Sequence, residues 1–183
     1  MSETSSCYRL SDSAPFQTYE DVVRHLNSLG LFHMDMGLDR MKRALHALGL
    51  DSFRCPAVQI VGTNGKGSTS VFLQSIAMAH GLNAGLYTSP HFVWPEERIR
   101  QNHTMLPRRV WPALAGEAVQ AEKDLTYFEL LTVMAASAFQ TSESDLMIFE
   151  AGLGGRYDAT TALPVEMVCF VPIGMDHMNV LGD

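Results

Sequence analysis

The apolar residues of this chain follow two kinds of pattern. In some stretches they recur every three or four positions, on one helical face, as between residues 19 and 29 before Gly30 and between residues 38 and 48 before Gly49. In others they form short unbroken runs, which are typical of buried strands. We predict helices over residues 19–29, 38–48, 68–80, 108–123 and 128–140, strands over residues 58–61, 84–87, 146–149 and 167–171, and a polar loop from residue 92 through residue 100.

Predicted strands and helices alternate along most of the chain. This alternation indicates an α/β fold with a mostly parallel, doubly wound sheet that helices cover on both faces. Ligands of such sheets bind beyond the carboxyl ends of the strands. The segments that follow the predicted strands, residues 62–68, 89–91, 150–160 and 174–177, are therefore the places to look for chemistry.

The composition is that of a globular protein, with 46% hydrophobic and 18% charged residues. Lys and Arg number 13 and Asp and Glu 20, so the net charge of −7 disfavours non-specific binding to nucleic acid or anionic lipid. No apolar run reaches the roughly 18 residues of a membrane span, and the polar N-terminus lacks a signal-peptide core. Three distant cysteines fit neither a disulfide framework nor a zinc site. We expect a cytoplasmic chain without nucleic-acid or membrane partners, in which residues 1–16 are a flexible leader and residues 17–183 a domain.

A glycine-rich turn lies between the first predicted strand and the helix that follows it. Its glycines let backbone N–H groups converge on an anion, the helix N-terminus adds partial positive charge, and Lys66 adds a full charge for phosphate. Gly67 separates Lys66 from Ser68, which departs from the common phosphate-loop pattern. The alternative is a turn whose glycines only supply positive φ angles. The predicted nucleotide-binding residues are Gly62, Thr63, Asn64, Gly65, Lys66, Gly67, Ser68 and Thr69.

Candidate magnesium ligands follow three other predicted strands. Glu150 closes an apolar strand just before the glycines of residues 152–155, as carboxylates that hold nucleotide magnesium do; the alternative is a solvated strand end. The Ser89 hydroxyl suits the same hard cation, although Pro90 alone would explain a turn there. A lone histidine is ordinarily not a ligand, but His177 follows the last strand, beside the other strand ends. We interpret His91 as structural.

The ordered segments GTNGKGST, YTSPH, ERIR, TYFE, EAGLGGRYDAT and a late Asp-His pair resemble folylpolyglutamate synthase and dihydrofolate synthase, ATP-dependent amide ligases of the Mur-ligase superfamily. The resemblance runs from about Asp35 to Asp183. It implies a phosphate-loop-containing fold of the Mur-ligase central-domain type, incomplete at the C-terminus. The chain would be the truncated N-terminal ATP-binding domain, with the C-terminal glutamate-ligase domain absent. Muramyl ligases typically carry Thr after the loop lysine, so Gly67 favours the folate branch.

The resemblance also implies an activity of the EC 6.3.2 type. In this family ATP phosphorylates a substrate carboxylate, and the amine of L-glutamate attacks the acyl phosphate, which adds glutamate to 7,8-dihydropteroate or a reduced folate. The implied cofactors are ATP and Mg²⁺, with Lys66 and His177 in catalysis and Ser89, Glu150 and His177 as magnesium ligands. The implied substrate-binding residues are His33, Met34, Asp35, Met36, Thr126, Tyr127, Phe128, Tyr157, Asp158 and Ala159. The alternatives are that Phe128 belongs to the core and that Asp158 is a turn or N-cap residue.

Two alternatives stay open, and a third is disfavoured. A muramyl-type amino-acid ligase would bind a uridine-linked substrate, and a non-catalytic nucleotide-binding remnant would bind ATP alone. A plain phosphate-loop phosphotransferase or GTPase is disfavoured by the displaced glycine and by the lack of an Asn-Lys-x-Asp segment. The family also uses a lysine shortly after the Asp-His pair, and the sequence ends at Asp183 without one. We therefore expect the 183 residues alone to be inactive, and the full-length enzyme to be a monomer.

Overall fold

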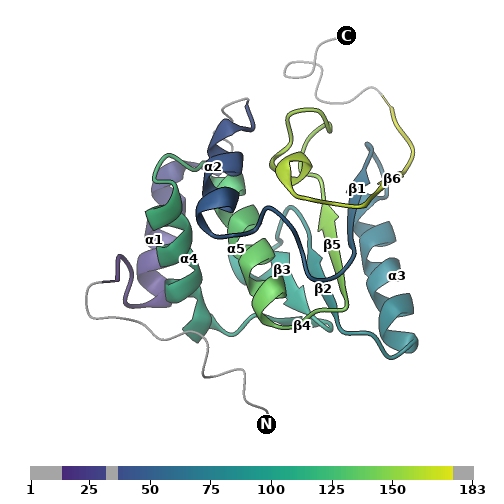
Figure 1. Ribbon diagram of the computed structural model, residues 1–183, viewed down its shortest axis with the longest axis horizontal. Helices are drawn as coiled ribbons and strands as arrows, with labels where there is room; N and C mark the ends of the chain where they lie inside the picture. Colours follow the sequence, from purple (N-terminus) through teal and green to yellow (C-terminus); the bar gives the residue numbers. More distant parts are fainter. Residues whose placement is uncertain (1–13, 32–36, 175–183) are drawn as a thin grey trace.

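Four neighbouring parallel strands make up most of a six-stranded sheet in the computed structural model, which describes residues 14–31 and 37–174 (Figure 1). The helices are α1 (Tyr19–Leu29), α2 (Asp39–Ala47), α3 (Lys66–Ala79), α4 (Trp111–Ala121) and α5 (Tyr127–Thr141). The strands are β1 (Ala57–Val61), β2 (Ala84–Tyr87), β3 (Ile99–Gln101), β4 (Thr104–Met105), β5 (Leu146–Glu150) and β6 (Met167–Phe170). Short 3₁₀ helices are η1 (Pro95–Arg98), η2 (Arg108–Val110) and η3 (Ala159–Ala162).

The strand order is β4-β3-β2-β5-β1-β6. Strands β2, β5, β1 and β6 run parallel, and β3 and β4 extend the sheet in antiparallel fashion beyond β2. The register aligns Ile60 of β1 with Glu150 of β5 and with Cys169 of β6. The carboxyl ends of these strands therefore reach one edge of the sheet, at the top of Figure 1. The prediction of an α/β fold with a mostly parallel sheet is confirmed.

Alternate strand residues point to two faces of the sheet, and each face has its own core. Tyr87 and Phe149 belong to a large apolar core that also takes in α1, α2, α4 and α5. Ile60 and Leu86 point the other way, into a small cluster that Val71 of α3 helps to cover. Helices thus cover both faces, with α3 on the right and α5 on the left in Figure 1.

Helix α5 packs closely on the sheet because β2 carries a glycine where the two meet. A Cβ atom at Gly85 would lie only 2.5 Å from the ring of Phe139, so any larger residue would push α5 away. The outer helices α1 and α2 contact α4 and α5 rather than the sheet. Trp111 of α4 is fully buried between these layers.

The described chain begins just before α1 and is packed there. Phe16, which the sequence analysis placed in the leader, is buried, and its ring centroid lies 5.2 Å from that of His25. Thr18 then starts α1 with a capping box, because its side chain accepts from the N–H of Asp21 while Asp21 accepts from the N–H of Thr18. Phe16 therefore belongs to the packed core. Residues 1–13 of the expected leader lie outside the described residues.

The segment that follows β2 differs from the predicted polar loop. It forms η1 and then β3, which pairs antiparallel with β2 and aligns Ile99 with Tyr87. Strand β4 pairs with β3 in turn. The loop prediction was wrong for these residues because strands of two and three residues, with arginine and glutamine in β3, are too short to show a period of two.

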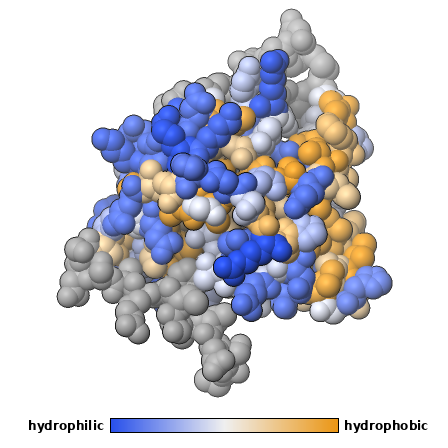
Figure 2. Space-filling view, viewed as in Figure 1, coloured by the Kyte–Doolittle hydropathy of each residue, from blue (hydrophilic) through white to orange (hydrophobic). Residues whose placement is uncertain are grey.

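Apolar side chains are exposed along the outer side of α3 and on β6, the edge strand of the described sheet. Phe72 is 67% exposed and Phe170 71% exposed, and Figure 2 shows the hydrophobic surface over these elements on the right. Strand β6 is thus far less covered than β1, which is buried throughout. Within the described residues, no helix has the length and apolar character needed to cross a membrane.

Candidate functional site

The turn between β1 and α3 presents the uncapped N-terminus of a helix at the carboxyl edge of the sheet. Gly65 is the N-cap residue, with a left-handed φ of 86°, and no side chain caps the helix. The N–H groups of the first turn, at Lys66, Gly67 and Ser68, have no acceptor within the helix. Such a group of converging donors is a binding site for an anion such as phosphate.

The same turn is held in place by the residues that follow β6. The N–H groups of Thr63 and Asn64 both donate to the carbonyl of Pro172, at 3.0 and 3.3 Å. Gly62 has a φ of 144°, and a Cβ there would lie 2.5 Å from a methyl group of Val171. Glycine is therefore required at position 62 both by its backbone angle and by this close approach.

Lys66 places its charge inside the turn. Its Nζ atom donates to the carbonyl oxygens of Gly62 at 2.8 Å and of Thr63 at 3.2 Å. The ammonium group therefore lies beside the first-turn N–H groups of α3 rather than in bulk solvent. Together they make a cationic cradle that suits the phosphates of a nucleotide.

A cavity of about 270 Å³ lies between this turn and the glycine loop after β5. Its polar side is formed by Thr63 and Lys66, and the glycine loop, residues 152–155, faces them. Phe170 and Ile173 supply an apolar wall. The cavity thus combines a cationic end with an apolar side, which suits a ligand that carries both phosphate and a flat organic part.

Glu150 ends β5 next to the first turn of α3. Its side chain is buried, and its Oε2 atom accepts the backbone N–H of Ser89 at 2.9 Å. Burial raises the pKa of this carboxyl, whereas the Ser89 N–H and the charges of Lys66 and Arg98 lower it in part. A buried carboxylate that faces the first turn of α3 and has one oxygen without a hydrogen bond suits a bound cation.

The residues present fit a hard divalent cation. Ser89 is adjacent to Glu150 through its backbone N–H, and neither the Ser89 hydroxyl nor Glu150 Oε1 has a hydrogen bond to any described residue. Magnesium keeps several waters and needs few protein ligands, so one carboxylate and one hydroxyl suffice. In the described part of the chain no three His, Cys, Asp or Glu side chains form a metal-binding group. His177, the third predicted ligand, lies outside the described residues.

Asp158 organises the glycine loop. Its Oδ2 atom accepts the N–H groups of Gly152 and Leu153 at 2.8 and 2.9 Å, and its Oδ1 atom accepts the N–H and hydroxyl of Thr160. Burial raises the pKa of Asp158, while these hydrogen bonds lower it in part. All four lone-pair positions of the carboxylate are thus used within the protein. Its expected role as a pterin ligand stays a prediction, and its observed role is to fix the loop and cap η3.

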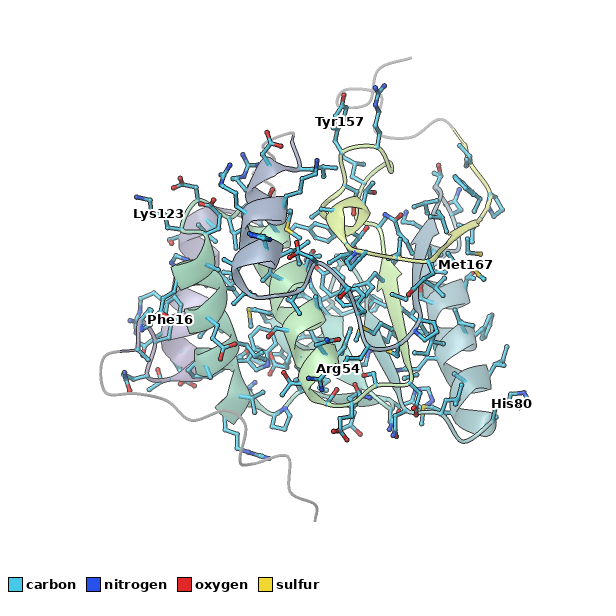
Figure 3. All side chains as sticks on the ribbon, viewed as in Figure 1. Phe16, Arg54, His80, Lys123, Tyr157 and Met167 are labelled. Atoms are coloured by element: carbon cyan, nitrogen blue, oxygen red, sulfur yellow. The ribbon has the colours of Figure 1, made fainter. Side chains whose placement is uncertain are left out.

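The other predicted substrate residues lie in two groups near the same edge. Thr126 caps α5, Tyr127 is buried, and the ring of Phe128 packs on Gly152, where a Cβ would lie 2.8 Å away. Beyond the glycine loop, Ala159 is buried, and Tyr157 is half exposed and points away from the sheet in Figure 3. The segment His33–Met36 lies outside the described residues.

Two residues at this edge carry contacts that the sequence analysis did not predict. Arg98 is buried, and its Nε atom donates to Nδ1 of His91 at 2.9 Å. This bond connects Arg98 to the turn that carries Ser89. His91, which the sequence analysis interpreted as structural, is the residue of the turn that accepts it. The only sequence signal was an arginine after two glutamates in a polar segment, a pattern that ordinarily marks a solvated surface.

No protein-family model matches the chain. Among curated proteins, it is 34% identical to the dihydrofolate synthase/folylpolyglutamate synthase of Bacillus subtilis over 177 residues, which are 92% of this chain and 41% of that protein. It is 38% identical to the Escherichia coli protein of the same name over 172 residues, 93% of this chain and 40% of the relative. The chain thus spans about two fifths of the length of the curated relatives it matches.

Solved structures of similar proteins share the fold. The chain matches E. coli FolC in complex with DHPP and ADP with a TM-score of 0.86 and 36% identity, over 91% of this chain and 41% of that chain. It matches the Yersinia pestis folylpolyglutamate synthase/dihydrofolate synthase complexed with AMPPNP and a Mn ion with a TM-score of 0.82 and 32% identity, again over 91% and 41%. A further match has Mn, AMPPNP and L-glutamate bound.

Proposed function

Because the chain is homologous to the dihydrofolate synthase/folylpolyglutamate synthase family and corresponds to a portion of these enzymes, we propose that it forms the ATP-binding part of a folate-pathway ligase. That ligase adds L-glutamate to dihydropteroate, to a reduced folate, or to both. The observation that carries the proposal is the meeting of Lys66, the α3 N-terminus and the buried Glu150 at one sheet edge.

The phosphates of ATP bind to the turn at residues 62–69. The first-turn N–H groups of α3 donate to phosphate oxygens, and Lys66 exchanges its contacts with the carbonyls of Gly62 and Thr63 for contacts with phosphate. Charge-assisted hydrogen bonds of this kind fix the γ-phosphate in position for attack. The cavity beside Phe170 and Ile173 takes the less polar part of the nucleotide.

Glu150 and Ser89 hold a magnesium ion beside these phosphates, and His177 is the proposed ligand of a second one. When bound, the metal neutralises phosphate charge and polarises the transferred group. The two residues contribute a carboxylate oxygen and a hydroxyl, and the backbone hydrogen bond between them keeps the two groups adjacent. The solved relatives that contain Mn and AMPPNP support a divalent cation with nucleotide at this site.

The acyl substrate presents a carboxylate to the γ-phosphate. Transfer of the phosphoryl group forms an acyl phosphate and releases ADP; attack by the amine of L-glutamate then forms the amide and releases phosphate. The ligands bound in the solved relatives, DHPP and L-glutamate, support this pair of substrates. Phe128 on the glycine loop and the exposed Tyr157 are the proposed flat surfaces for the pterin ring.

The proposal is tested by calorimetric titration of the chain with AMPPNP, once with Mg²⁺ and once with EDTA. We expect saturable binding that Mg²⁺ strengthens. Lys66→Ala removes a charge-assisted contact and should weaken binding about 10- to 100-fold under both conditions, on the scale of 1.5 to 3 kcal/mol for one such bond.

Lys42→Ala is the matched control, because it removes an exposed lysine from α2, which does not line the cavity. It should bind AMPPNP like the wild type. Equal affinities for the wild type and a folded Lys66→Ala variant would refute the phosphate-loop assignment.

A further inference from the structure

Arg98 is a buried arginine without a carboxylate partner. Only 4% of the surface of Arg98 is exposed. Among the residues that the structure describes, no carboxylate oxygen lies within 4.0 Å of its nitrogen atoms, although five other basic side chains form such pairs. Burying a guanidinium without a carboxylate partner costs free energy, so other interactions of Arg98 must stabilise its buried position.

Its hydrogen bonds to residues 88–91 connect Arg98 to the turn between β2 and η1, and its guanidinium also interacts with the Tyr87 hydroxyl at the end of β2. The Nε atom of Arg98 donates to Nδ1 of His91 at 2.9 Å, and its backbone carbonyl accepts the N–H of Thr88 at 2.9 Å. Its guanidinium carbon lies 5.3 Å from the ring centroid of Tyr127, at the start of α5. The side chain of Arg98 therefore holds the His91 end of the turn and packs on the Tyr127 ring, whereas the bond to Thr88 is made by its backbone.

The turn carries Ser89, whose N–H donates to Glu150 Oε2 at 2.9 Å. A displacement of residues 88–91 would break this bond and separate the hydroxyl of Ser89 from the carboxylate. The neighbouring residue Glu97 fixes a different part of the loop, because its carboxylate accepts the N–H groups of residues 92–94. Arg100 donates to the Thr88 hydroxyl at the start of the turn at 3.4 Å, and the Arg98 side chain holds its His91 end.

We propose that Arg98 is a positioning residue that acts through His91 to hold the Ser89 hydroxyl beside Glu150 as a cation-binding pair. The proposal rests on the function proposed above, in which these two residues hold the metal. Arg98 itself touches neither the metal nor the nucleotide. Groups one step removed from a metal typically change its affinity 10- to 100-fold when they are lost, because they orient the ligands.

Two measurements on the 183-residue chain test the proposal. The first is hydrogen exchange of the backbone amides of Thr88, Ser89 and His91 without any ligand. In Arg98→Met, whose side chain fills similar space without the hydrogen bond, we expect exchange about tenfold faster in this turn and unchanged in α3. The second is the ratio of AMPPNP affinities with and without Mg²⁺, which should fall about 10- to 100-fold while the affinity in EDTA stays constant.

Variants of His91 separate the hydrogen bond from the charge. His91→Leu removes the acceptor and should reproduce both effects of Arg98→Met. His91→Asn places an amide oxygen near the Nδ1 position and should restore both values toward the wild type. Arg43→Met is the control, because Arg43 also donates one short hydrogen bond, 2.6 Å to Glu122, but lies on α2.

Unchanged exchange in the turn of Arg98→Met overturns the proposal. A loosened turn with an unchanged magnesium ratio overturns the link to the cation pair. If the wild type does not bind AMPPNP, the proposed function fails, and the exchange of residues 88–91 still decides whether Arg98 positions the turn.

Discussion

The carboxylate of Glu150 faces the first turn of α3 at Gly67. A Cβ atom on Gly67 would lie 3.4 Å from Oε1 and 3.5 Å from Oε2 of Glu150, in van der Waals contact with both oxygens. The glycine between Lys66 and Ser68 therefore keeps open the space between the helix N-terminus and the carboxylate. This is the space that a cation shared by phosphate and Glu150 would need.

Gly67→Ala should keep the fold and impair the site. Alanine favours a helix over glycine by about 1 kcal/mol, and position 67 does not have a positive φ, so the melting temperature should not fall. The methyl group should nevertheless weaken magnesium-dependent AMPPNP binding roughly tenfold or more by blocking the approach to Glu150. Calorimetry with Mg²⁺ and with EDTA measures this. Gly116→Ala in α4 is the control; a similar loss there would contradict the explanation.

Glu150→Gln should separate the contribution of the metal to AMPPNP affinity from the contribution of the phosphate contacts. The amide can still accept the N–H of Ser89 through its oxygen, but it lacks the charge that attracts a cation. We expect AMPPNP affinity in Mg²⁺ to fall at least about tenfold, while affinity in EDTA stays equal or rises, because a negative charge near the phosphates is removed. Since burial raises the pKa of Glu150, the neutral variant should also be at least as stable as the wild type.

The exposed Glu20→Gln on α1 controls for the loss of one negative charge. Equal loss of affinity in Mg²⁺ and EDTA would identify Glu150 as a structural residue instead.

Asp158→Ala should destabilise the protein. The change removes four hydrogen bonds to a buried carboxylate and frees the N–H groups of Gly152 and Leu153. We expect the free energy of unfolding to fall by about 2 to 4 kcal/mol, measured by urea denaturation, and Asp124→Ala at an exposed position to change it little. Wild-type stability together with lost pterin binding would instead support a direct substrate role for Asp158.

Glu96 should make the stability of the chain sensitive to acid. Burial alone would raise the pKa of Glu96, but hydrogen bonds from the Tyr19 hydroxyl and the Arg108 guanidinium bring it below its ordinary value. A carboxyl with a lowered pKa in the folded state stabilises the protein above its unfolded pKa, and this stability is lost as the pH falls through the folded value.

Glu96→Gln should therefore cost about 1 to 2 kcal/mol at neutral pH and show a shallower decline of stability below about pH 4.3. Urea denaturation between pH 3 and 7 measures both quantities. Parallel curves for the wild type and the variant would show that Glu96 is not the group responsible.

The strands around the site were predictable because their signals are local. A run of apolar residues followed by glycines and a lysine predicts β1, the turn and the start of α3 together, because the three features occur in a fixed order in phosphate-binding turns. Glu150 was found in the same way, as the acid that closes an apolar run. The expected boundaries at Val58 and Ser68 differ from the observed ones by only one or two residues.

The contacts that hold the site were not predictable, because they join residues that are distant in sequence. The bond between Ser89 and Glu150 spans 61 positions, and nothing local marks it. From the sequence, Asp158 could be either a turn residue or a substrate ligand. The sequence does not show which donors will bond to the oxygens of its carboxylate. Arg98 was missed because a charged residue in a polar segment gives no sign that it is buried.

The two cores of the protein differ greatly in size, and the smaller one lies under α3. Phe72 and Ile76 on the outer side of this helix are 67% and 56% exposed, so they add little to its attachment. Segments with few buried apolar contacts open more often than the rest of a protein. The helix that begins at the phosphate turn is therefore attached to the sheet through a small apolar area, and a nucleotide bound at its N-terminus would add to that attachment.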